Sequence, residues 1–315
     1  MRKFHLPAWM MTWIKAAKNW SEDGAFAHSA AVSFYTLFSL APVTIITLSI
    51  AGLFFGREAA TEQFTAQIGQ LVGENSAKMI QETVAESQPQ DRGWLATGIS
   101  IGVLVVGATT VFAQLQDALN RIWGVKAKPS RAGWLVLIMQ RVISFAMVLT
   151  VGFLLLVSLL LTTALSTFVE YINARIPIPA ILVQGVDVFV ALGVITILFA
   201  CVFKIMPDVH VRWRDVWRGA FVAAILFSVG RVVIALYLKY SDVASVYGAA
   251  GSLVGLLIWI YYSCAILLYG AEFTRAHREQ NGLPVTPKST AVLVRQEVVE
   301  TSEAGELTTN RDKRD

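Results

Sequence analysis

Two charged side chains of opposite sign lie inside apolar runs of this sequence. Asp187, with Gln184 nearby, lies in the run 178–203, and Arg231 lies in the run 219–238. A helix that crosses a bilayer needs about 20 apolar residues, so both runs are long enough. A charge at the bilayer centre costs at least about 2.5 kcal/mol. The sequence therefore predicts that these side chains face the protein interior, as an ion pair or as the lining of a polar recess.

The two charges are predicted at matching depth. If the connector 204–218 lies on one side of the membrane, Asp187 is nine residues inward from Ile178 and Arg231 is nine residues inward from Tyr240. At about 1.5 Å of rise per residue, both lie roughly 13 Å below the same face. Two interpretations stay open. The pair borders a substrate path, or it only fixes the register of the two neighbouring helices against each other.

A second group of polar residues is expected at the cytoplasmic ends of the helices. The pattern of the run 94–113 continues as QLQDALNRIWGV, and the last apolar run ends at a glutamate that an arginine such as Arg121 or Arg141 can meet. Four residues form this predicted cytoplasmic mouth: Asp117, Asn120, Arg121 and Glu272. A structural cap over the bundle explains the same pattern.

The composition excludes an ordinary soluble domain. Hydrophobic residues make up 55% of the 315 residues, charged residues make up 15%, and the mean hydropathy is +0.58. These values are typical of a polytopic membrane protein. Because Cys201 and Cys264 both lie in apolar runs, we interpret them as small buried residues and not as a disulfide or metal site.

The predicted fold class is all-α, with six transmembrane helices. A domain 29–278 is expected to contain spans at about 30–55, 94–113, 142–162, 178–203, 219–238 and 248–273. The segments on one side of these spans hold 16 Lys and Arg residues, and the alternate loops hold 5. The positive-inside rule therefore places both termini in the cytoplasm.

The segments outside the spans have their own patterns. Residues 1–28, with tryptophans near helical spacing, predict a helix at the membrane interface. The polar loop 56–93 predicts short amphipathic helices on the periplasmic side. Residues 279–315 contain no aromatic residue and are expected to form a disordered cytoplasmic tail.

Small residues and one proline predict how the helices meet. Pro42 removes a backbone donor in the first span, so a kink is expected near Ser39. Glycines at spacings that allow close helix approach are interpreted as packing positions. They are Gly98, Gly102, Gly248, Gly251 and Gly255.

Four strings in order resemble the YihY/BrkB family of bacterial inner-membrane proteins. They are AAVSFYTLFSLAPV, QDALNRIWGV, MPDVHVRWRDVWRGA and YGAAGSLVGLLIWIYYSCAILLYGAEF, and the resemblance covers roughly residues 10–278. It implies a six-helix fold in the bacterial inner (plasma) membrane. The family's labels include virulence or serum resistance, an older ribonuclease BN name, and proposals of solute or lipid transport.

The residues themselves argue against a nuclease. The four histidines, His5, His28, His210 and His277, are scattered, and no carboxylate cluster of the kind that holds catalytic metal ions is evident. We expect no cofactor, no bound metal, no nucleic-acid partner and no enzymatic activity. A transporter or flippase for a small solute or phospholipid is favoured, and a membrane scaffold in envelope assembly is the alternative. Membrane lipids are the expected partners, and oligomer formation stays open.

Overall fold

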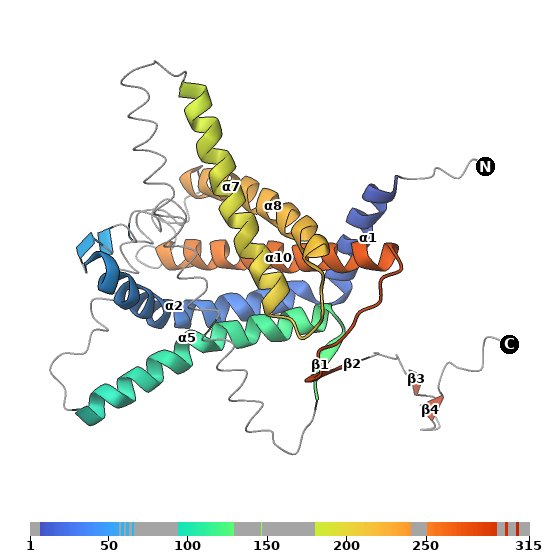
Figure 1. Ribbon diagram of the computed structural model, residues 1–315, viewed down its shortest axis with the longest axis horizontal. Coiled ribbons are helices and arrows are strands. Elements are labelled where there is room, and N and C mark those ends of the chain that lie inside the picture. Colours follow the sequence, from blue (N-terminus) through green and yellow to red (C-terminus); the bar gives the residue numbers. More distant parts are fainter. Residues whose placement is uncertain are drawn as a thin grey trace.

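A computed structural model describes residues 7–56, 94–128, 180–240 and 251–294, with short pieces at 58–59, 61–62, 65, 146, 300–301 and 307–308. It is almost entirely helical (Figure 1). The helices are α1 (Ala8–Glu22), α2 (Ala25–Phe55), α5 (Trp94–Ile122), α7 (Ala180–Ile205), α8 (Trp213–Tyr240) and α10 (Gly251–Gln280). The strands are β1 (Val125–Ala127), β2 (Ala291–Leu293), β3 (Glu300–Thr301) and β4 (Leu307–Thr308).

Within the described residues, three helices are long and apolar enough to cross a membrane. Their apolar windows are Val188–Ile205 in α7, Trp213–Ile234 in α8 and Leu253–Gln280 in α10. Each coincides with one of the apolar runs in the sequence, which confirms that these runs are helical. The predicted span at 142–162 and almost all of the loop 56–93 lie outside the described residues. The number of spans and their orientation therefore stay predictions.

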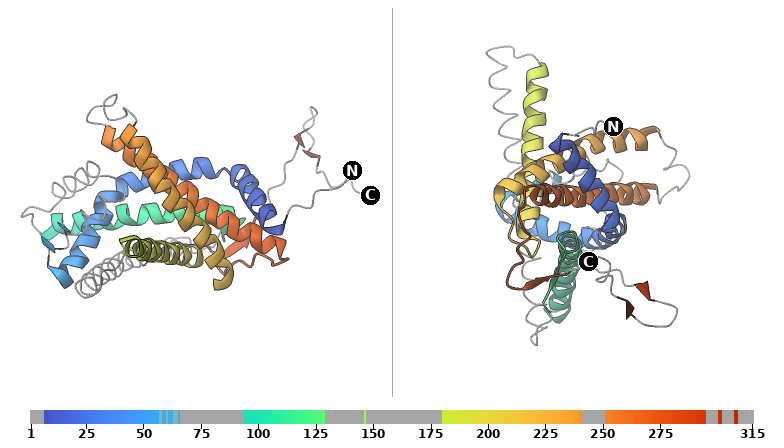
Figure 2. Two further views of the ribbon diagram at one scale, coloured as in Figure 1. Left: turned by 90° about the horizontal axis from the view of Figure 1, so that it is seen from above. Right: turned by 90° about the vertical axis from the view of Figure 1, so that its right-hand side faces the viewer.

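α10 is the central helix of the described bundle. It packs against α8 on one side and against α1 and α2 on others, and it also contacts α5. α2 and α5 pack side by side, and α7 packs on α8 (Figure 2). The C-terminal ends of α5, α7 and α10 gather with α1 and the β1–β2 pair at one end of the bundle (Figure 1). We call this the polar end.

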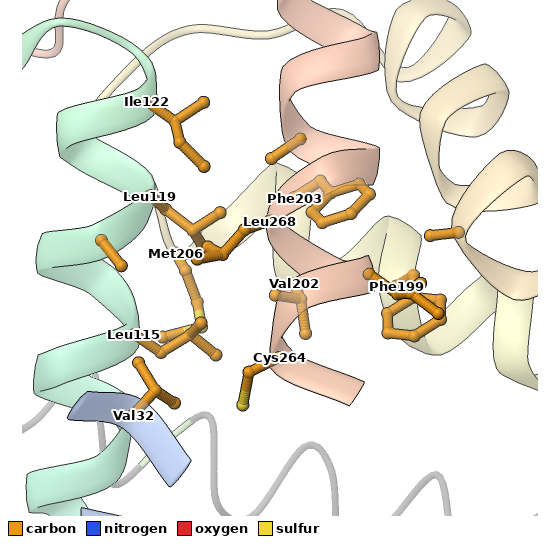
Figure 3. Packing of buried hydrophobic residues seen from close by; sticks show 14 of the residues in the cluster. Val32, Leu115, Leu119, Ile122, Phe199, Val202, Phe203, Met206, Cys264 and Leu268 are labelled. Carbon is orange, nitrogen blue, oxygen red and sulfur yellow. The ribbon is translucent and has the colours of Figure 1, made fainter. Parts of the chain in front are cut away.

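The apolar core lies next to the polar end. Leu119 of α5, Phe203 of α7 and Leu268 of α10 converge there and are each at most 1% exposed (Figure 3). Met206 fills the space beyond the end of α7 and is also buried. Close packing of these side chains fixes the spacing of α5, α7 and α10, and thereby positions the charged groups that follow the core along each helix.

The contact between α8 and α10 depends on glycines that the sequence pattern did not single out. A Cβ atom added at Gly219 would lie 1.9 Å from Thr274 Oγ1 and 2.5 Å from the carbonyl oxygen of Gly270. A Cβ atom at Gly230 would lie 1.8 Å from the hydroxyl oxygen of Tyr262. At Gly219 a larger side chain would meet a backbone atom, whereas at Gly230 it would require the Tyr262 ring to shift.

The predicted packing glycines have mixed outcomes. Gly251 and Gly255 are buried in α10. Gly248 lies outside the described residues. The packing around Gly98 is also outside the described part of the chain. Gly102 is exposed on α5, and no atom of the described residues lies within 4 Å of the position of an added Cβ atom. Its close contact stays a prediction.

α2 continues through Pro42 as one helix and curves along its length (Figure 1). One turn before the proline, the Ser39 hydroxyl donates a hydrogen bond of 2.5 Å to the carbonyl oxygen of Gly107 on α5. A polar side chain that bonds a neighbouring helix costs little inside a bundle. The small hydroxyl residues of this helix therefore serve packing at this point.

The N-terminal segment forms the helix that its pattern predicts, and two of its tryptophans are tied to α10. Trp20 donates through Nε1 to the carbonyl oxygen of Ala265, at 3.1 Å. Trp13 packs edge-on against Phe273, with ring centroids 5.3 Å apart. Trp9 remains 63% exposed. α1 ends at Glu22, and the turn into α2 passes through Gly24, whose φ of 70° is readily adopted only by glycine.

The prediction of a disordered tail from residue 279 is wrong for residues 279–294. α10 continues to Gln280, and the chain then returns over the polar end as a strap of residues 283–294. Strand β2 of the strap pairs antiparallel with β1, and Val209 forms a bridge with Pro287. The polar composition misled the prediction because backbone pairing, and not apolar burial, holds most of this segment.

Candidate functional site

Arg275 lies at the centre of a charged cluster at the polar end. Its Nη1 atom lies 2.8 Å from Asp23 Oδ2, in the turn between α1 and α2, and also donates to the carbonyl oxygen of Ile122 at the end of α5. Its Nε atom donates to Glu279 Oε1 at 2.9 Å, one turn along α10. One side chain thus links α10 to two other parts of the bundle.

Two further residues complete this cluster, which we call the Arg275 cluster: Lys15, Asp23, Glu272, Arg275 and Glu279. Lys15 of α1 lies 2.9 Å from Glu279 Oε2. Glu272 Oε1 lies 3.8 Å from Arg275 Nη1. The cluster contains three carboxyl groups and two cations. Full ionisation would therefore leave one negative charge without a cation inside the cluster.

Glu272 is the unusual member of the cluster because its side chain is 0% exposed. Neither carboxylate oxygen accepts a regular hydrogen bond from the part of the chain that the structure describes. A buried carboxylate without hydrogen bonds is costly, and a cation at 3.8 Å offsets only part of that cost. Such a group is suited to binding and releasing a proton or another small cation.

A second polar network joins α5 to the connector between α7 and α8. Asn120 donates through Nδ2 to Asp208 Oδ2 at 2.8 Å and accepts the backbone N–H of Asp208 through Oδ1 at 2.7 Å. Gln116, one turn earlier on α5, adds a longer contact of 3.4 Å to the same carboxylate. All three side chains are buried. This two-way bond fixes the connector against the end of α5.

A third polar contact involves the strap. Arg278 Nη1 lies 2.9 Å from Asp215 Oδ2 in the first turn of α8, and Arg278 Nη2 donates to the carbonyl oxygen of Pro284. Lys288 donates to the carbonyl oxygen of Ile205 at 3.2 Å. Burial lowers the pKa of the Lys288 ammonium, Asp208 opposes this shift, and Lys204 reinforces it.

The structure separates the four residues of the predicted cytoplasmic mouth. Asn120 and Glu272 are buried, in the two different networks described above, whereas Asp117 and Arg121 are exposed on α5. Asp117 and Arg121 are close enough to His28 of α2 to interact with it electrostatically. The cation beside Glu272 is Arg275 of the same helix, and the suggested partner Arg141 lies outside the described residues.

The predicted intramembrane pair remains a prediction. Asp187 and Gln184 belong to α7 and Arg231 belongs to α8, and these two helices pack on each other. The side chains of Gln184 and Asp187 lie outside the described part of the chain. Arg231 is half-buried at the edge of the exposed side of α8. The helix pairing that an ion pair would require is therefore present.

Sequence reasoning missed Arg275, Arg278, Asp208 and Asp215. Arg275 and Arg278 contribute only to the Lys and Arg count that predicts orientation, and Asp208 and Asp215 appear only as part of the connector 204–218. A usable signal was present in α10, where Glu272, Arg275 and Glu279 are spaced three and four residues apart and hence share one helix face. Spacing of this kind does not reveal which other helix meets that face.

The described residues offer no catalytic constellation of a familiar kind. They contain no group of three His, Cys, Asp or Glu side chains that could hold a metal ion. Cys201 and Cys264 are both free thiols, with Cys264 buried. The chemistry that this site supports is ion pairing, proton uptake and hydrogen bonding within a membrane bundle.

Comparison with known proteins adds relatives that are named only as membrane proteins. A UPF0761 membrane protein of Pseudoalteromonas translucida is 26% identical over 284 residues, which cover 87% of each chain. A UPF0761 membrane protein of Ralstonia nicotianae is 28% identical over 86% of this chain. One from Nitrosospira multiformis is 30% identical over 77% of this chain.

The matches to the last two relatives span only 59% and 55% of those longer proteins. No solved structure matches this chain. A family model described as "Virulence factor BrkB" matches residues 16–292, which include every helix end at the polar end and nearly all of the strap. The chain is therefore a membrane protein that belongs to the BrkB family.

Proposed function

We propose that this protein moves a small solute or lipid across the membrane, and that its buried charges border the path. The observation that carries this proposal is Glu272. It is a wholly buried carboxyl group on an apolar helix, without a hydrogen bond in the described residues and with one cation 3.8 Å away. Ionisable groups inside membrane bundles generally face a pathway or a proton relay.

The Arg275 cluster supplies what a coupled transporter needs at one end of its path. Its three carboxyl groups exceed its two cations, so binding of one proton or small cation would balance the charge. The Arg275 guanidinium contacts Asp23 and Glu279. A change of charge at Glu272 would therefore alter the electrostatic attraction between Arg275 and Asp23, in the turn after α1. A binding event could in this way be transmitted to helix ends.

Arg231 on α8 and the predicted partner Asp187 on α7 extend this proposal toward the other side of the membrane. At about 1.5 Å per residue, Arg231 lies roughly 18 Å along α8 from Gly219, the residue packed beside Thr274. Charged groups at both depths are what a continuous polar route would require. They support the proposal without identifying the substrate.

The alternative function is a membrane scaffold in envelope assembly. It is favoured by the number of links at the polar end, where Arg275 and Arg278 join helix ends that a moving transporter would need to separate. Under this alternative the charges are architectural. Their replacement would then reduce stability and activity together.

Reconstitution of purified protein in liposomes tests the proposal. Flux of labelled phospholipids and of candidate solutes is measured with and without a proton gradient. We expect flux with the native chain, loss of flux with Glu272→Gln, and normal flux with the control Glu22→Gln, which alters an exposed glutamate paired with Lys18. Absence of flux in well-folded native protein for every substrate and gradient would reject transport.

A charge exchange separates the two functions at the predicted intramembrane pair. Asp187→Asn and Arg231→Gln are each expected to abolish flux. The exchange Asp187→Arg with Arg231→Asp restores an ion pair of reversed polarity. If the exchanged protein folds normally but remains inactive, the charges act on a substrate. If it recovers both folding and function, they are architectural and the scaffold is favoured.

A further inference from the structure

A basic and aromatic surface lies outside the networks described above, on the connector and the first turns of α8. We call it the connector surface, and it consists of Lys204, Arg212, Trp213, Arg214, Trp217 and Arg218. Its three arginines are exposed, and so are its two tryptophans, at 47% and 43%. The Lys204 ammonium lies 5.8 Å from the ring centre of Trp213.

The cations of this surface have no acid beside them in the connector. All residues from 204 to 218 are described, and the only acids among them are Asp208 and Asp215. Both are buried, and their carboxylates are bonded to Asn120 and Arg278. The three arginines of this segment are therefore exposed without a neighbouring carboxylate of that segment, and Arg218 also contacts His277 Nε2. Lys204 is half-buried and donates to the carbonyl oxygen of Val211.

The exposed side of α8 places this surface at a definite depth. From Trp217 to Tyr237 this side presents Phe221, Ile225, Val229 and Val233, all of them at least 40% exposed. Twenty residues of helix extend about 30 Å, which equals the thickness of the hydrocarbon layer. Tryptophan and tyrosine prefer the two boundaries of that layer. Trp213 and Trp217 then lie at the level of the lipid headgroups.

We propose that the connector surface is a binding site for the phosphate of an anionic phospholipid. Arginine guanidinium groups bind phosphate oxygens through paired hydrogen bonds, and the three exposed arginines flank the two exposed tryptophans in the sequence, at headgroup depth. The acyl chains of the same lipid would lie along Phe221 and Ile225. A zwitterionic lipid presents a cation of its own to these arginines and binds more weakly.

The continuous apolar side of α8 favours a lipid over a soluble anion or a nucleic acid. A free phosphate ion would not cover Trp217 or Phe221, and a nucleic acid would stack on indole rings that border water and not hydrocarbon. The site does not depend on the transport proposal, because lipid binding is measured without flux. Failure of the liposome flux assay would leave it intact.

The test uses the delipidated full-length chain in a neutral detergent and native mass spectrometry. Phosphatidylglycerol and phosphatidylcholine are titrated separately. The variant combines Arg212→Gln, Arg214→Gln and Arg218→Gln, and its matched control combines Lys18→Gln, Lys126→Gln and Lys128→Gln at exposed positions elsewhere. A variant with lysine at the three arginine positions keeps the charge and removes the paired hydrogen bonds.

We expect phosphatidylglycerol to bind at least about tenfold more tightly than phosphatidylcholine, and the glutamine variant to lose most of this preference. The control should retain it, and the lysine variant should retain part of it. Trp213→Ala with Trp217→Ala should weaken lipid binding but not binding of inorganic phosphate. The proposal would be overturned if both lipids bound equally well, or if the control lost the lipid preference as fully as the glutamine variant. It would also be overturned if millimolar phosphate displaced the lipid, or if the protein preferred single-stranded RNA.

Discussion

The Nη1 atom of Arg278 lies 2.9 Å from Oδ2 of Asp215, and the two side chains are only 6% and 12% exposed. This ion pair joins the last turn of α10 to the first turn of α8. Asp215 is also favourably placed for the positive end of the α8 dipole. Arg278 reaches the strap through Pro284. A single arginine therefore connects two membrane helices and the returning chain.

Removal of both partners of this pair should destabilise the protein by less than the sum of the two single removals. Asp215→Asn leaves a buried guanidinium without its counter-charge, and Arg278→Met leaves a buried carboxylate, each at a cost of about 3 kcal/mol. The double variant should lose at least about 1 kcal/mol less than the sum of the two single losses. Unfolding of the detergent-solubilised protein measures this. Strict additivity would show that the two groups do not interact.

Addition of one methyl group at Gly219 should disrupt the contact between α8 and α10. The new Cβ atom would meet the Gly270 carbonyl oxygen at 2.5 Å, and a backbone atom cannot rotate away. We expect Gly219→Ala to lower stability by at least about 2 kcal/mol. The control is Gly193→Ala on α7, where no atom of the described chain lies within 4 Å of the new atom. A loss of the same size in both variants would contradict the packing argument.

Much of this fold could be predicted from the sequence because apolar run length is a local property. The runs at 178–203 and 219–238 became α7 and α8, and the pattern after residue 113 correctly indicated that α5 continues. The contact of Gly219 with Gly270 could not be predicted in this way. Both residues are ordinary within their own helices, and only the rotation and offset of α8 against α10 bring them together.

The charged networks could not be predicted from the sequence for a related reason. Basic residues at helix ends satisfy the positive-inside rule, so topology alone accounts for the presence of Arg275 and Arg278 in the sequence. Burial distinguishes them, and burial at a helix end depends on what packs over it. The strap contacts Arg278 through the carbonyl oxygen of Pro284. Arg275 is instead enclosed by the turn at Asp23 and the end of α5. The AVLV run of the strap, at 291–294, was the one apolar signal in a polar segment, and it includes strand β2.

Glu272 and Arg275 should differ sharply in their effect on stability. Glu272→Gln keeps the volume of the side chain and removes a buried charge without hydrogen bonds, so stability should be unchanged or slightly higher. Arg275→Met removes the cation shared by Asp23, Glu272 and Glu279 and should cost about 3 kcal/mol. Thermal unfolding of both variants checks this. A large loss with Glu272→Gln would show that its carboxylate is held for stability, as the scaffold function requires.

The partial burial of Lys288 predicts that the free energy of unfolding changes with pH in the alkaline range. Burial lowers the pKa of this ammonium in the folded state, so the unfolded chain binds more protons between that lowered value and the ordinary pKa of about 10.4. Stability contributed by this group should therefore rise with pH through that window and decline as the pH falls below about 10.4. Lys288→Met should flatten the slope. The exposed Lys126→Met serves as the control, and an equal slope in both variants would refute the prediction.

Truncation of the chain tests whether the strap is part of the folded unit. The strap is held by backbone hydrogen bonds from Lys288 to Asp208, from His210 to Thr286 and from Val294 to Gly124, in addition to the β1–β2 pair. A chain that ends at residue 282 should lose about 2 kcal/mol or more, since each such bond contributes about 1 kcal/mol. It should also expose Arg278, which loses Pro284.

A chain that ends at residue 294 provides the matched control for this truncation. The described strands beyond that point, β3 and β4, pair with each other and not with β1 or β2. Their removal should leave the unfolding temperature unchanged within error. If both truncated chains were as stable as the full chain, the strap would not cover the polar end in the membrane. The burial of Arg278 and the partial burial of Lys288 would then require another explanation, because no other described segment bonds to both the connector and β1.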